Sequence, residues 1–173
     1  MKKDEYVTDC SDIDDVIVFL RDGKMMITKV DAKTFVGKDI IHIAIFDKSD
    51  KRTIYNMIYR DGKSGPSYIK RFNVSGVTRD KAYDLTYVTA GSQVLYFSCN
   101  PNGEAEVITI LLRQIGTVKK LKFDIDFANL ARNEILRFST RYHNLPTKKL
   151  MTILYKIDTI KLKETVNSYE KGV

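Results

Sequence analysis

The sequence TIYNMIYRDGKSGPSYIKRF, residues 53–72, has the pattern of a β-hairpin with a basic end. Residues 54–59 alternate between two side-chain sets and are rich in residue types that favour strands. The run stops at Asp61-Gly62, a dipeptide that tolerates the positive φ of a tight hairpin turn. A second strand-like run, residues 68–72, then returns. The stretch therefore predicts two antiparallel strands joined at Asp61-Gly62.

The same unit recurs along the chain. RDGK at residues 21–24 matches RDGK at residues 60–63, 39 positions later, and the run after each turn is again strand-like. A third copy is predicted from strand 94–99, a turn over residues 100–103 and a return through residues 105–110. A degenerate fourth begins near residue 135. Hairpins repeating about every 40 residues are typical of the blades of a propeller-like array.

The repeats predict an all-β protein of three to four blades, each with four strands. We place the repeats near residues 13–48, 49–90, 91–130 and 131–163, after a lead-in at residues 1–12 and before a tail at residues 164–173. The apolar run 39–46 suits a buried inner strand. Residues 49–52 are predicted to form a polar connector. We expect a short helical turn or loop at residues 127–134 and a further strand at residues 150–163.

Composition indicates the cellular compartment of the protein and argues against metal binding by its cysteines. No apolar run approaches the roughly 20 residues of a membrane span, and the N-terminal residues lack the apolar core of a secretory signal. We therefore expect a cytoplasmic protein with no membrane partner. The two cysteines, Cys10 and Cys99, are far apart and form no metal-binding pattern.

The residue types that carry catalysis or metal binding are scattered, and we expect no catalytic residue, metal site or cofactor. The acidic residues 12, 14 and 15 lack the glycine and distal glutamate of a calcium loop and read as a solvated turn. His42 lies in an apolar run and reads as a packed strand residue. Cys99 reads as a small buried residue without a partnering histidine. The glycines are dispersed at turns and form no phosphate-cradling loop.

Cations recur at matched positions in the repeats, and the net charge is +7. If the repeats rotate about an axis, matched positions fall on one rim. Such a basic stripe suits phosphate binding, although a merely solvated surface explains the charge as well. The candidate phosphate contacts are Lys29, Lys70, Arg71, Arg79, Lys81, Lys119, Lys120 and Arg132.

Long strings within the repeats resemble one known family. RDGK and KRF, then GVTRDKAYDLT at residues 76–86 and VLYFSCNPNGEAEV at residues 94–107, are similar to the C-terminal domain of the A subunit of bacterial topoisomerase IV, a relative of the gyrase A subunit. The similarity runs from about residue 13 to at least residue 126 and weakens afterwards. Residues 132–142 resemble the basic loop of the family, but Asn133 and Leu136 replace its two glycines.

The resemblance implies a β-pinwheel, a disc whose blades exchange strands and whose basic outer edge binds and bends duplex DNA. It places the DNA-cleaving tyrosine, the metal-binding acidic site and the ATPase in other domains or subunits. The implied partners are double-stranded DNA, the remainder of the A subunit, and the ATPase subunit, in the bacterial cytoplasm at the nucleoid. The gyrase-type string QRRGGKG is absent, so capture of DNA for decatenation and relaxation is favoured over negative supercoiling.

Two other classes of function remain open. The chain fits a protein-interaction propeller with an incidental basic surface. A stand-alone enzyme that uses Cys99, His143 or a tyrosine fits less well, because these residues lack catalytic partners.

Lys70 and Arg71 differ as candidate contacts. Side chains alternate along a strand, so the two cations face opposite ways and at least one must face outward. Arg71 is the stronger candidate for a rim position, because its repeat counterpart Lys29 is also cationic, whereas Lys70 matches Thr28. The alternative is that Arg71 pairs with a neighbouring carboxylate.

Overall fold

The computed structural model describes residues 6–31, 33–112, 122–130, 134–137 and 157–162. Within these ranges the chain forms three antiparallel sheets, and the only helix is the 3-10 turn η1 (Phe127–Asn129). Sheet 1 has the order β3-β1-β2-β6, sheet 2 the order β10-β5-β4-β7, and sheet 3 the order β11-β8-β9. The all-β prediction is confirmed. The strands are β1 (Asp15–Leu20), β2 (Lys24–Lys29), β3 (Ile40–Phe46), β4 (Ile54–Arg60), β5 (Ser67–Phe72), β6 (Ala82–Asp84), β7 (Gln93–Asn100), β8 (Val107–Leu112), β9 (Lys122–Asp126), β10 (Glu134–Arg137) and β11 (Ile157–Leu162).

The first two predicted hairpins are confirmed. Strand β1 pairs with β2, and β4 pairs with β5, with Tyr59 opposite Tyr68. Gly23 has φ +86° and donates its N–H to Leu20 O at 3.0 Å, and Gly62 has φ +75°. Both glycines adopt the left-handed conformation that other residues rarely take.

The third predicted hairpin is wrong. The turn exists, because Gly103 N donates to Asn100 O at 3.0 Å, but it does not join two paired strands. Instead β7 pairs with β4 in sheet 2, and β8 pairs with β9 and β11 in sheet 3. A turn reverses the chain without specifying the partner of the strand that follows. Here β7 buries Val94 in the core beside sheet 1, and β8 begins the next sheet.

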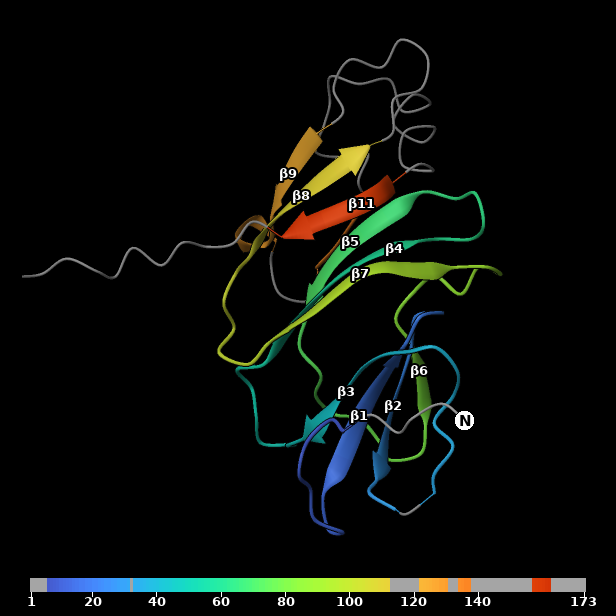
Figure 1. Ribbon diagram of the computed structural model, residues 1–173, viewed down its shortest axis with the longest axis vertical. Helices are drawn as coiled ribbons and strands as arrows, with labels where there is room; N and C mark the ends of the chain where they lie inside the picture. The colour runs from blue at the N-terminus through green and yellow to red at the C-terminus, as the bar shows by residue number, and fades with distance from the viewer. Residues whose placement is uncertain (1–5, 32, 113–121, 131–133, 138–156, 163–173) are drawn as a thin grey trace, which may run out of the picture.

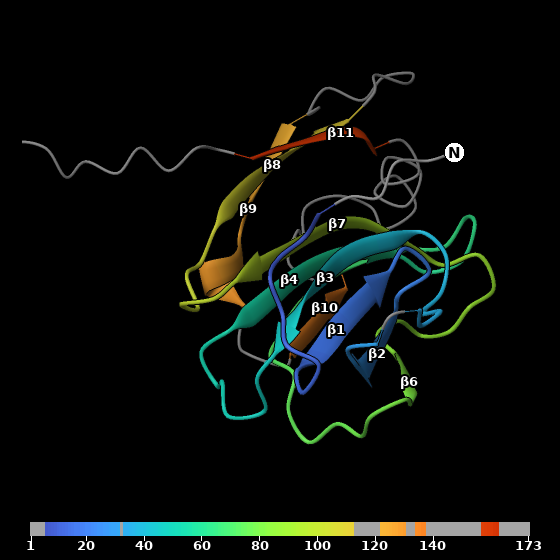
Figure 2. The same ribbon diagram turned by 60° about the horizontal axis from the view of Figure 1, so that its bottom comes forward.

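Two strands pair within a sheet whose other strands come earlier in the sequence than the strand just before them. Strand β6 follows β5 in sequence but pairs with β2 in sheet 1, and β10 follows β9 but pairs with β5 in sheet 2. Figure 1 shows the three sheets one above another along the long axis, and Figure 2 shows β10, which Figure 1 leaves unlabelled. Each of these two hairpins thus gains a further strand from a later part of the chain. Two sheets have the predicted four strands; the domain limits and a complete pinwheel remain predictions.

The prediction of a buried inner strand at residues 39–46 is wrong. Strand β3 is the edge of sheet 1 and pairs only with β1 among the described strands. Its side chains are mostly half buried, and Ile40 and Ile45 are exposed. Ile41, Ala44 and Phe46 pack against the core, and the His42 ring lies 5.9 Å from the Phe19 ring between centroids, so the strand is only partly covered. A continuous apolar run therefore does not distinguish an edge strand from an inner one.

The main core lies between sheets 1 and 2. Ile17, Phe19 and Met25 from sheet 1 pack against Tyr55 and Met57 from sheet 2, and all are almost fully buried. The Phe19 ring lies at the centre of an aromatic cluster, 4.8 Å from the Tyr55 ring and 4.5 Å from the Phe97 ring between centroids. This burial fixes which face of each sheet looks inward.

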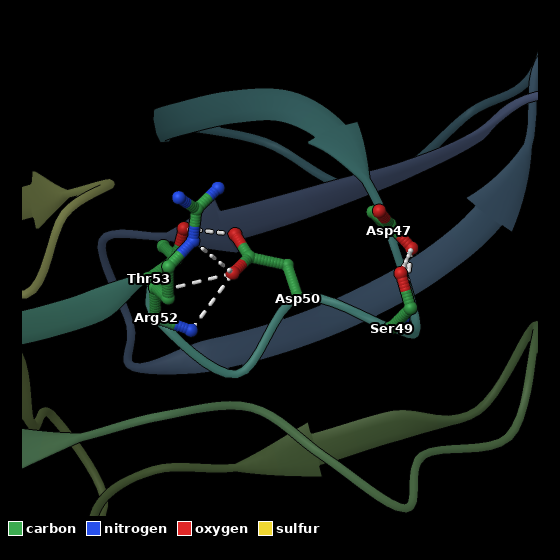
Figure 3. Close-up of polar contacts among 5 residues, drawn as sticks. All are labelled: Asp47, Ser49, Asp50, Arg52 and Thr53. Atoms are coloured by element: carbon green, nitrogen blue, oxygen red, sulfur yellow. Dashed lines mark hydrogen bonds and ion pairs between the residues drawn. The ribbon is translucent and has the colours of Figure 1, made fainter.

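The predicted polar connector between β3 and β4 is confirmed, and it is built from two consecutive aspartate turns (Figure 3). Asp47 Oδ1 accepts hydrogen bonds from the backbone N and the hydroxyl of Ser49, both at 2.7 Å. Asp50 accepts from Arg52 N at 2.8 Å and from the Thr53 hydroxyl at 2.5 Å. These hydrogen bonds lower the pKa of both carboxyls and hold the chain as it passes from sheet 1 to sheet 2.

Candidate nucleic-acid interface

Three of the predicted contacts, Lys29, Arg79 and Lys81, lie at one edge of sheet 1, which we call the β2–β6 edge. Lys29 ends β2, and Arg79 and Lys81 lie just before β6, the strand that pairs with β2. Asp80 N donates to Ile27 O at 2.7 Å and fastens this segment to β2. All three cations are exposed. The strand crossover therefore brings together cations from two distant parts of the sequence.

Side chains also attach the segment before β6 to strands β1 and β2 of sheet 1. Arg79 Nε lies 2.6 Å from Oδ1 of Asp15, a carboxylate that is 6% exposed. The Thr28 hydroxyl donates to Asp80 Oδ1 at 2.8 Å. The predicted solvated acidic turn is thus wrong for Asp15, which is buried and paired. Asp15 offsets part of the Arg79 charge. Of the three cations, Lys29 and Lys81 form no ion pair among the described residues.

Lys70 is not one of the three cations of this edge; it lines a groove between sheets 1 and 2, whose lining also includes Tyr83 of β6. Its Nζ donates to Leu85 O at 3.2 Å and lies 4.9 Å from the centroid of the Phe72 ring. Burial lowers the pKa of the Lys70 ammonium. The side chain is half buried, so part of it remains accessible from the groove.

The expectation that Arg71 lies on the rim is wrong. Arg71 is 8% exposed, and its guanidinium donates from Nη1 to Phe127 O at 2.9 Å and from Nη2 to Gly103 O at 3.0 Å. Lys70 and Arg71 do face opposite ways, as predicted. The carbonyl groups that cover Arg71 come from η1 and the β7–β8 connection, both adjoining sheet 3. The repeat counterpart Lys29 is exposed at the end of its strand.

Arg71 belongs to a group of polar side chains between sheets 2 and 3 that the sequence analysis did not predict. Asn56 stands opposite both Arg71 and Ser98 in register, and its Nδ2 donates to Glu106 Oε1 at 2.6 Å. The Tyr96 hydroxyl donates to Glu106 Oε2 at 2.7 Å, and the Ser98 hydroxyl donates to Oε1. One signal pointed here: Asn56 is a polar residue at the centre of an apolar strand. Buried polar groups require such partners. We call Asn56, Arg71, Tyr96, Ser98 and Glu106 the polar seam.

The remaining candidates lie outside the described residues. These are Lys119, Lys120 and Arg132, together with most of the basic-loop segment 132–142. Their role as phosphate contacts stays a prediction.

Residues 1–133 match the family model for the topoisomerase C-terminal domain of Bacteroidota. The chain belongs to this family. The resemblance to the topoisomerase C-terminal domain seen in the sequence is confirmed.

One characterised relative of this topoisomerase C-terminal domain is the A subunit of DNA topoisomerase 4 from Borreliella burgdorferi, which is 26% identical over 98 residues. The match covers 56% of this chain and 15% of the relative. The domain thus corresponds to a small part of that protein. No solved structure is significantly similar to the chain.

The side chains that resemble catalytic groups occupy packed positions in this topoisomerase C-terminal domain. His42 lies against the rings of Phe19 and Phe97, and burial lowers its pKa, as expected for a packed strand residue. Cys99 is half buried, and burial raises the pKa of its thiol. Among the described residues, no group of three or more potential ligands is placed to hold a metal ion. No helix in these ranges has the length and apolarity to cross a membrane.

The two thiols should differ in reactivity. Cys10 is exposed, whereas Cys99 is half buried with a raised pKa and hence a smaller thiolate fraction. At about pH 8 we expect iodoacetamide to label Cys10 faster than Cys99 by roughly tenfold or more. Mass spectrometry of timed samples measures this ratio, and labelling in urea, which should equalise the two sites, is the control. Equal rates in the folded protein would contradict the burial of Cys99.

Proposed function

We propose that this domain binds and bends duplex DNA as the accessory domain of the A subunit of a type IIA topoisomerase of the topoisomerase IV kind. The observation that carries the proposal is the convergence of Lys29, Arg79 and Lys81 at one exposed edge of sheet 1. The family membership and the net charge of +7 support it. The role is to hold and orient DNA segments for strand passage, decatenation and relaxation.

The proposed interaction is electrostatic. Each lysine or arginine that neutralises a phosphate releases condensed counterions, so binding is sequence-tolerant and weakens steeply with salt. Bending a site of 20–30 base pairs costs about 1 to 6 kcal/mol. The domain should therefore prefer flexible or pre-bent duplexes.

The domain acts without a catalytic residue, metal or cofactor of its own in this proposal. The cleaving tyrosine and the ATP-dependent step belong to other parts of the enzyme. Its partners are double-stranded DNA, the remainder of the A subunit, and the ATPase subunit. Its compartment is the bacterial cytoplasm at the nucleoid.

A second candidate function is a protein-interaction module. Phe35, Ile40 and Ile45 are exposed on sheet 1 and its β2–β3 loop, at 78%, 45% and 42%. Under this reading DNA affinity would be weak, and the same salt series described next separates the two functions.

Replacing Lys29 and Lys81 together by alanine should weaken binding to unrelated duplexes about equally. If each lysine neutralises one phosphate, the slope of log affinity against log salt falls in magnitude by about 1.8, which corresponds to about 30-fold weaker binding near 0.15 M salt. Fluorescence anisotropy over a salt series measures both quantities. The fold should persist, because both side chains are exposed and form no ion pair among the described residues.

The matched control replaces Lys48 and Lys51, two exposed lysines of the β3–β4 connector, by alanine. It changes the net charge equally but should leave the slope within about 0.3 of the parent. Equal losses in the two variants would show that net charge alone drives binding. An unchanged slope in the Lys29, Lys81 variant would remove the β2–β6 edge from the DNA path.

A further inference from the structure

An open groove of about 320 Å³ lies between sheets 1 and 2, beside β5 and β6. Its walls are mainly apolar, and one cation, Lys70, belongs to its lining. The lining residues used below are Met25, Lys70, Phe72, Tyr83, Asp84 and Leu85.

Lys70 is anchored in this groove but not neutralised there. Among the described residues its Nζ makes one hydrogen bond, to Leu85 O at 3.2 Å, and no ion pair. An ammonium group has three N–H donors, so two remain for another acceptor. The face of the Phe72 ring, 4.9 Å away, favours the charged form but accepts no conventional hydrogen bond. Because burial lowers the pKa of Lys70, a bound anion would relieve the cost of holding this charge.

A second cation, Lys81, lies beside one of the groove's lining residues. Lys81 and Tyr83 share a side of the chain by strand alternation, and Lys81 Nζ lies 5.3 Å from the centroid of the Tyr83 ring, which lines the groove. Asp84 also contributes to the lining, and it stands opposite Lys24 of β2 in register, within reach of that cation. The lining thus contains one cation, Lys70, and one carboxylate, Asp84, and the second cation, Lys81, lies beside the lining residue Tyr83.

We propose that this groove is a phosphate subsite for nucleic acid, in which Lys70 and Lys81 bind one backbone phosphate between the first two sheets. The proposal rests on the proposed function and adds to it a specific position at which a phosphate of the nucleic acid contacts the domain. Lys81 also belongs to the β2–β6 edge, so a duplex bound along this edge would lie next to the groove. A phosphate there would meet two ammonium groups, while the apolar walls would limit competing hydration and strengthen the contact.

Replacing Lys70 by methionine tests the subsite with little disturbance of the fold. Methionine has a similar length and suits the apolar walls, whereas the ammonium charge is lost. We expect the log affinity versus log salt slope to fall in magnitude by about 0.9 and affinity to fall about fivefold near 0.15 M salt. Lys48→Met, the same change at an exposed connector lysine, should leave both unchanged. A slope equal to the parent value in folded Lys70→Met would overturn the subsite.

A second measurement on the unmodified protein keeps the test independent of the folding of the variant. In protein carrying 13Cε-labelled lysine, a short duplex should shift the NMR signals of Lys70 and Lys81 but not that of Lys48. Polyglutamate at equal charge is the comparison: a shift of Lys70 by polyglutamate and not by duplex would overturn the proposal in favour of an acidic protein partner. If duplex binds and shifts other lysines only, the subsite fails while the proposed function stands. If duplex does not bind at all, both fail.

Discussion

Replacing Arg71 by methionine should lower the free energy of unfolding by about 3 kcal/mol and leave the salt slope of DNA binding unchanged. Arg71 is buried, and its guanidinium donates to Phe127 O and Gly103 O. Losing a charged donor costs its hydrogen bonds and leaves two carbonyl groups without that partner, each a penalty of about 1 to 3 kcal/mol when buried. Methionine retains the packed aliphatic part of the side chain, so the loss of unfolding free energy reports on the guanidinium group alone.

The control for Arg71 is its repeat counterpart. Lys29→Met removes a cation at the matched position, but there the side chain is exposed, so stability should change by less than about 0.5 kcal/mol. Urea titration followed by circular dichroism measures stability, and the anisotropy salt series measures phosphate contacts. The two variants should therefore give opposite results: Arg71→Met affects folding, and Lys29→Met affects binding. An Arg71 variant of parent stability with a reduced slope would contradict the buried geometry.

Replacing Phe19 by alanine should destabilise the domain by about 3 to 5 kcal/mol. The Phe19 ring is 1% exposed and contacts the rings of Tyr55 and Phe97 across the interface of sheets 1 and 2. Truncation removes its buried surface, and the surrounding rings, held on two different sheets, cannot close the cavity fully. The midpoint of urea unfolding should fall by an amount that reflects this loss.

Phe35→Ala is the matched control for Phe19. It deletes the same ring from the β2–β3 loop, where the side chain is 78% exposed, and should change stability by less than about 0.5 kcal/mol. Comparable losses in the two variants would show that the core is not centred on Phe19. Stability that is unaffected in both would contradict the packing of sheet 1 on sheet 2.

The contrast between Arg71 and Lys29 bears on the proposed interface. Both occupy the same place in the hairpin repeat, yet one fastens sheet 2 to the segments around sheet 3 and the other is exposed at the β2–β6 edge. The polar seam contributes further hydrogen bonds from Asn56 and Tyr96 to Glu106. Position in a repeat therefore does not assign a cation to DNA binding. What the structure decides is whether the next sheet covers the cation or leaves it exposed.

The sequence by itself determined the local features of this protein. Alternation in residues 54–59 and the Asp-Gly turns at residues 22–23 and 61–62 predict two hairpins that the structure contains, because strand periodicity and turn conformation depend on neighbouring residues. The long strings at residues 76–86 and 94–107 were also sufficient to identify the family.

Only the tertiary structure decided how these units combine. Strand β7 pairs with β4 rather than β8, β6 and β10 return to the preceding sheets, and β3 is an edge strand. The pattern within a strand specifies which side chains share a face, but not which distant strand pairs with it or which sheet covers it. Repeat position for that reason predicts the wrong environment for Arg71: its burial depends on carbonyl groups of Gly103 and Phe127, which lie far along the chain and reach it only when sheet 3 packs on sheet 2.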